Sequence, residues 1–189
     1  MNGLAHSCYL FAIDQRLNFD AGTTAFTVGA TVTGGSSEAT GTVKTVTVST
    51  GSWAENDAAG YLILSGVSGT FENDEALTGD GDPTGAATAN GANSDYVNSY
   101  GKKTQTVSST ATTCRFYNKK AVPGDLEYGW SGSFPAVILP AGTTLFEGQH
   151  VSSTETGFTH TFEIQWPPVY YHDGEGTVHH ITCGLKAVT

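Results

Sequence analysis

Nine consecutive residues in the C-terminal part of the chain, from 158 to 166, alternate between two kinds of side chain without interruption. One face carries Phe158, His160, Phe162, Ile164 and Trp166, and the other carries only polar residues. Because successive side chains of a strand point to opposite faces, this period of two predicts a half-buried β-strand. We expect His160, on the apolar face of this strand, to be a buried neutral imidazole that is hydrogen-bonded to the backbone.

The composition extends the β prediction to the whole chain. Only 14% of the 189 residues are charged, 24 are glycine, and threonine and serine recur throughout. This composition favours strands and turns. No window of ten residues shows the apolar spacing of an amphipathic helix. We therefore predict an all-β protein of one or two small domains.

Charge and cysteine content exclude several classes of protein. The net charge of −10 argues against a general nucleic-acid binder, because phosphate binding needs clustered lysine and arginine. We expect no signal peptide and no membrane span, since no apolar run is long enough. Three widely spaced cysteines, Cys8, Cys114 and Cys183, favour buried thiols in a reducing compartment over a disulfide framework.

An internal repeat indicates how the chain is organised. The segment 26–34 recurs forty-five positions later as 71–79, and each copy has phenylalanine, an aliphatic residue six positions on, and then Thr-Gly. Two related hairpin-like units around a central strand pair predict an inserted acidic β-domain over residues 20–94. Residues 1–19 and 95–189 would form a small β-barrel core domain, with the insertion in the loop after its first strand.

No motif predicts catalysis, a metal or a cofactor. His179 and His180 beside Cys183 suggest metal ligands, but adjacent strand residues point to opposite faces and do not easily share one ion. No serine or cysteine lies in a nucleophile elbow. The acidic turn at 80–85 lacks the remaining ligands of a calcium loop. We expect a protein that is not an enzyme.

Two groups of residues are candidates for contacts. Large aromatic and proline side chains in or beside loops are candidates for an interface between subunits or with a partner: Trp130, Phe134, Trp166, Pro167, Pro168, Tyr170 and Tyr171. The basic pairs that flank the strand around Cys114 are candidates for contacts with acidic surface or with DNA in a channel: Lys102, Lys103, Lys119 and Lys120.

The segments outside the insert resemble the head-closure proteins of tailed bacteriophages, also called stoppers or head–tail connectors. The N-terminal part of the resemblance rests on His6-Ser-Cys-Tyr-Leu-Phe, Asp95-Tyr-x-x-x-Tyr-Gly101 and Thr113-Cys-Arg-Phe-Tyr117. The C-terminal part follows the family's order through the segments 136–143, 146–151, 157–164, 167–170 and 180–186. Gln149-His150 stands where the family usually has Asp-Arg. The insert is similar to a β-module found in phage structural proteins.

The resemblance implies a structural virion protein of the phage neck. It would form a homo-oligomeric ring, twelvefold in the family, with the portal or adaptor protein above and the tail or tail terminator below. Packaged DNA would pass through without sequence-specific binding, and assembly would occur in the host cytoplasm without a membrane.

Three alternatives remain open. The chain could be another phage component, such as a tail terminator, a decoration protein or a baseplate protein. It could be a carbohydrate-binding β-module that uses Trp53, Tyr61, Trp130 and Tyr171 as platforms for sugars. It could also be a metal-dependent enzyme built on the histidines and cysteines.

Overall fold

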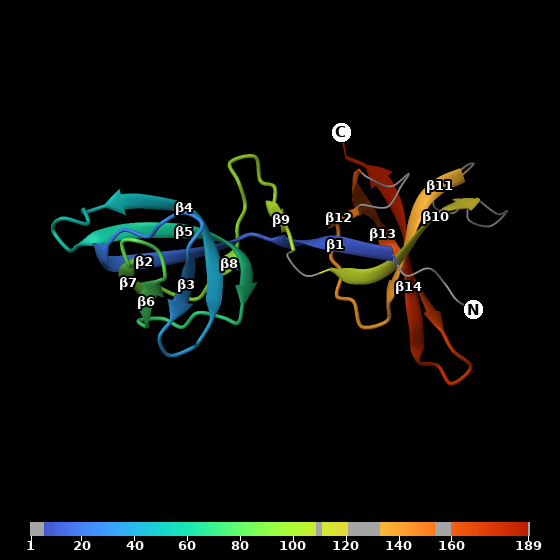
Figure 1. Cartoon of the computed structure of the whole chain (residues 1–189), viewed down its shortest axis with the longest axis horizontal. Coiled ribbons are helices and arrows are strands. Elements are labelled where there is room, and N and C mark those ends of the chain that lie inside the picture. The colour runs from blue at the N-terminus through green and yellow to red at the C-terminus, as the bar shows by residue number, and fades with distance from the viewer. Residues whose placement is uncertain (1–5, 109–110, 121–132, 154–159, 189) are drawn as a thin grey trace. The chain divides into compact units, whose positions relative to one another are not determined.

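The protein is an all-β structure that divides into two compact units (Figure 1). The computed structural model describes residues 6–108, 111–120, 133–153 and 160–188, except for the side chains at 118–120 and 133–134. One unit, the core barrel, comprises residues 1–11 and 107–189, and the other, the insert, comprises residues 12–106. The predicted fold class, a barrel with an inserted β-domain, is confirmed.

The core barrel is a closed antiparallel sheet of six strands. Its strands are β1 (His6–Ile13), β10 (Thr112–Lys120), β11 (Ser133–Pro140), β12 (His150–Ser153), β13 (Thr161–His172) and β14 (Val178–Ala187). They follow the order β10-β11-β14-β13-β12-β1, and β1 also pairs with β10, with His6 opposite Cys114. The N-terminal strand therefore closes the barrel, while β9 (Gln105–Val107) extends the sheet beyond β1.

Alternating side chains of these strands form the apolar interior of the core barrel. Cys114 and Phe116 are buried on β10, as predicted, and Ile181, Cys183 and Leu185 are buried on β14. Cys8, Cys114 and Cys183 are all buried thiols that form no disulfide, which confirms the prediction of buried thiols. The interior thus joins residues from the two ends of the chain in one hydrophobic cluster.

The alternation from which we predicted β13 holds only in the first half of the strand. Phe162 and Ile164 are buried as expected, but Trp166 is exposed. The register of β13 against β14 shifts between Gln165 and Val169, where two consecutive prolines cannot donate to the ladder. His160 precedes the strand and is exposed, so the expectation of a buried imidazole was wrong. Phe158 lies outside the described residues.

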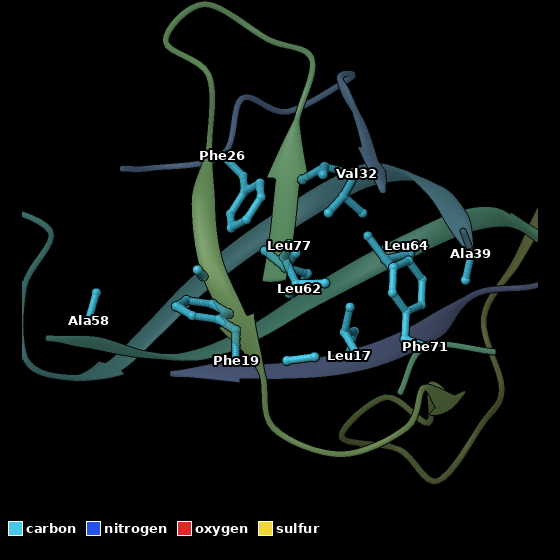
Figure 2. Packing of buried hydrophobic residues seen from close by; sticks show 13 residues of the cluster. Leu17, Phe19, Phe26, Val32, Ala39, Ala58, Leu62, Leu64, Phe71 and Leu77 are labelled. Atoms are coloured by element: carbon cyan, nitrogen blue, oxygen red, sulfur yellow. The ribbon is translucent and has the colours of Figure 1, made fainter. Parts of the chain in front are cut away.

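The insert is a second closed sheet. Its strands are β2 (Gln15–Thr24), β3 (Thr31–Gly34), β4 (Thr40–Thr50), β5 (Ala58–Ser68), β6 (Ala76–Gly79), β7 (Ala86–Ala89) and β8 (Ser94–Asp95). They follow the order β5-β4-β3-β6-β7-β2, and β5 pairs with β2 to close the ring, while β8 adds to the other edge of β2. Phenylalanine and leucine side chains fill its interior (Figure 2).

The sequence repeat corresponds to two sets of three strands, β2, β3 and β4 in the first and β5, β6 and β7 in the second, which interleave in the sheet because β2 lies between β5 and β7. The repeated segments pair with each other where β3 meets β6, and Thr33 lies opposite Thr78, forty-five positions later. Where β2 meets β5, Leu17 lies opposite Leu62, again forty-five positions later. An approximate two-fold axis therefore relates the halves. Each half contributes three strands, rather than the hairpin that we expected.

The insert extends further at both ends than the expected range of 20–94. β2 begins at Gln15 and belongs to the insert over its full length, because it pairs with β5, β7 and β8. Asp14 is completely buried, and its backbone N–H donates to the carbonyl of Thr104 at 2.9 Å. These contacts tie the entering and returning chain segments to the same unit, so the division falls at residues 11/12 and 106/107.

Candidate interaction surface

The second half of β13 exposes large apolar side chains on the core barrel. Trp166 and Tyr170 are each 47% exposed and Tyr171 is 42% exposed, and Val169 between them is also exposed. In Figure 1 this part of β13 and the start of β14 form a hairpin that extends beyond the neighbouring strands of the barrel. Exposed aromatic residues gathered on one short segment are typical of contact surfaces.

The same part of β13 has an open edge. On one side β14 pairs with β13 as far as His172. On the other side the short strand β12 pairs only with residues 161–163, followed by a single bond from the Ile164 N–H to the Gln149 carbonyl at 2.8 Å. Among the described residues, no strand pairs with this side of β13 from Gln165 onward. An unpaired, apolar strand edge is a template for another strand.

Four of the seven candidate interface residues are exposed in the structure. Trp166, Pro167, Tyr170 and Tyr171 are all exposed on β13, whereas Pro168 is buried and is removed from the candidate surface. Trp130 lies outside the described residues. Phe134 lies on β11, with its Cα opposite that of Lys119, but its side chain is not among those described.

The four candidate lysines belong to different units. Lys102 and Lys103 lie in the insert, in the loop between β8 and β9, and the Lys103 Nζ is 2.7 Å from an Asp95 carboxylate oxygen. Tyr100 in this loop is 87% exposed. Lys119 and Lys120 lie on β10 in the core barrel, and their side chains are outside the described part. The pairs therefore do not form one site in either unit.

Sequence reasoning missed a close pair of histidines in the hairpin. The Nδ1 atoms of His179 and His180 are 2.9 Å apart, so the argument that these side chains point to opposite faces was wrong. Cys183 does not join them as a ligand: it is fully buried in the barrel interior, and burial raises the pKa of its thiol to about 12. Among the residues described, no three potential ligands gather at a metal site.

The aromatic residues that suggested carbohydrate binding do not form a common platform in the insert. Trp53 stacks on Phe19, with ring centroids 5.3 Å apart, and packs against the hydrophobic core. The ring of Tyr61 is covered by the guanidinium of Arg16 at 4.1 Å. One face of each of these two rings is therefore engaged in a contact within the insert.

Comparisons with known proteins identify no relative. No protein-family model matches the chain, and neither the curated proteins nor the solved structures include one that is detectably similar. In the described segments, no helix is long and apolar enough to cross a membrane.

Proposed function

We propose that the chain is a structural protein of the tailed-phage neck, which forms a ring between the portal or adaptor and the tail. In this role it closes the DNA-filled head and docks the tail. The protein acts by binding, and the proposal assigns it no catalytic residue. The sequence resemblance suggests this role, and three features of the structure support it.

The observation that carries the proposal is that the resembling segments, apart from 95–101, which lies in the insert, belong to one barrel. They contribute to β1, β10, β11, β12, β13 and β14, in the order in which the family's motifs occur. A chance set of short motifs has no reason to coincide with all six strands of a closed sheet. The insert enters after β1 and therefore leaves the barrel complete.

The departure from the family at Gln149 has a role inside the barrel. Gln149 is buried, and its Nε2 donates to the carbonyl of Phe11 at 2.9 Å. This bond fixes the turn before β12 against the N-terminal strand. Gln149 therefore makes a contact within the barrel at a position where the family usually has a charged residue.

The open edge of β13 suits a ring of identical subunits. Contacts around a closed ring are heterologous, so each subunit needs one surface that fits a different surface on its neighbour. Trp166 and Tyr170 provide apolar area beside an unpaired strand edge. The net charge of −10 disfavours adhesion of DNA to the protein, as passage of packaged DNA requires.

Imaging of assembled particles tests the proposal. In a tailed phage that encodes the chain, we expect density for the barrel in a ring at the head–tail junction. The double variant Trp166→Ser with Tyr170→Ser should accumulate heads without tails. Tyr100→Ser, which changes an equally polar and even more exposed tyrosine in the insert, is the matched control and should assemble normally.

Two results would overturn the proposal. One is the absence of the chain from purified particles. The other is its location on the capsid surface, at the end of the tail tube or in the baseplate, which would favour a decoration, tail-terminator or baseplate protein. Light scattering of the purified chain supplements the imaging, and a monomer alone does not contradict the proposal, because a ring can form on its partner.

A further inference from the structure

Two adjacent histidines on β14 have ring nitrogens within hydrogen-bond distance of each other. The Nδ1 atom of His179 lies 2.9 Å from the Nδ1 atom of His180, and the two rings meet edge to face, with centroids 5.2 Å apart. Consecutive side chains of a regular strand diverge to opposite faces, so this contact needs a local cause.

The cause is a bulge in the hairpin formed by β13 and β14. Tyr171 lies opposite His180, but the next residue of β13, His172, lies opposite Val178. His179 is therefore an extra residue on β14 without a partner in the register. A bulge bends the strand and re-aims side chains, and such bulges recur beside functional sites. Here it turns two neighbouring imidazoles toward each other.

The position of one imidazole is held from the opposite strand. The ring of Tyr171 stacks on the ring of His180, with centroids 4.7 Å apart and planes within 11° of parallel. His180 is half-buried between this ring and the strand, whereas His179 is exposed. One nitrogen donor is thus fixed, and the second is accessible to solvent beside it.

We propose that the Nδ1 atoms of His179 and His180 form a bidentate binding site for a divalent transition metal. Metal–imidazole bonds are about 2.0–2.1 Å long, so donors 2.9 Å apart subtend an angle of about 90° at the ion. In the free protein, one Nδ1–H donates to the other Nδ1. On metal binding this proton moves to Nε2 of the same ring, and both Nδ1 lone pairs face the ion.

This angle distinguishes between metals. A right angle between two nitrogens suits the square-planar or tetragonal arrangements of Cu²⁺ and Ni²⁺, whereas the tetrahedral sites of Zn²⁺ need donors further apart. Within the described residues no third protein ligand is near. Water, or a donor from another molecule, completes the coordination. The site does not depend on the proposed role in the phage neck.

Copper titration of the full chain, purified without a histidine tag, tests the site. We expect one tight Cu²⁺ per chain, with the electron paramagnetic resonance signature of two equatorial nitrogens. His179→Ala and His180→Ala should each weaken binding by about tenfold or more. Zn²⁺ should compete less well than Ni²⁺, the reverse of what a tetrahedral site would give.

Three controls make the result decisive. His172→Ala removes another histidine of the same hairpin and should leave the affinity unchanged. Tyr171→Phe should retain binding and Tyr171→Ala should weaken it, because the stacking ring positions His180 without touching the ion. His179→Gln replaces the alanine variant if circular dichroism shows that the latter is unfolded. Equal binding by the wild type and His179 variants, or an equal loss in His172→Ala, would overturn the proposal.

Discussion

Leu17 and Leu62 lie directly opposite each other on β2 and β5, and both side chains are completely buried. They occupy the same position in the two sequence repeats of the insert, as do Phe26 and Phe71. The core of the insert is therefore built twice from one pattern, and the two copies meet at this leucine pair (Figure 2). Because the strands of the two repeats interleave in one closed sheet, the two repeats should fold together.

Replacing one leucine of this pair should destabilise the whole insert. We expect Leu62→Ala to reduce the free energy of unfolding by about 3 kcal/mol, because it removes buried methyl groups and leaves a cavity. Hydrogen exchange measured by mass spectrometry should show faster exchange in both β2 and β5. Val48→Ala, at an exposed position on β4, is the control and should cost less than about 1 kcal/mol. Faster exchange in β5 alone would contradict the prediction that the two repeats of the insert unfold together.

Glu75 should make the insert sensitive to acid. Its buried carboxylate accepts bonds from the Ser36, Ser37 and Glu72 N–H groups and from the Ser37 hydroxyl, at 2.7–3.0 Å. Burial alone would raise its pKa, but these bonds favour the charged form and leave the pKa of Glu75 below its usual value. This stabilisation is fully present above the unfolded pKa of about 4.3 and is lost as the pH falls through the lower folded value.

Urea denaturation at pH 7 and pH 3 measures this contribution. We expect Glu75→Gln to lower the free energy of unfolding by about 2 kcal/mol at pH 7. The variant should lose less further stability on acidification than the wild type. Glu72→Gln retains the backbone donor but changes only an exposed side chain, so it should behave like the wild type. An identical pH dependence of wild type and Glu75→Gln would disprove the assignment.

Asp14 should be essential for the junction segments of the insert. Its carboxylate is completely buried and accepts bonds from the Lys44 Nζ at 2.7 Å and the Thr104 and Thr106 hydroxyls at 2.8 and 2.6 Å. Asp14→Ala leaves these donors without their acceptor, and we expect a loss of about 3 kcal/mol. A double-mutant cycle with Lys44→Ala should show coupling between the two residues. If the losses in free energy of unfolding of the two single variants add up to that of the double variant, the ion pair contributes nothing to stability.

The three cysteines should resist chemical modification in the folded protein. Cys8 and Cys183 are completely buried, Cys114 nearly so, and the pKa of Cys183 is raised to about 12, so little reactive thiolate forms at pH 8. A thiol reagent should label no cysteine in native buffer and all three in denaturant. Cys183→Ser should reduce the number labelled in denaturant by one. Rapid labelling of native protein would show that the core barrel opens readily.

The sequence by itself determined the fold class and much of the interior. Periods of two on β10 and β14 correctly placed Phe116 and Leu185 inside, because alternation is a local property of a strand. The forty-five-residue repeat likewise identified the duplicated part of the insert. The boundaries that we expected for the insert lay inside the observed ones, because the pairing of β2 with β5 and β8 is not visible in local composition.

The tertiary structure alone decided the features on which the two proposals depend. The edge of β13 is open from Gln165 onward because the antiparallel strand β12 begins only at His150, opposite Glu163, and this register is set by pairing between distant segments. His179 and His180 converge because one residue of β14 has no partner on β13, a register shift that alternation within either strand cannot reveal. Local patterns fix which face of a strand is apolar, but only the pairing of strands fixes which edges stay open and where side chains are re-aimed.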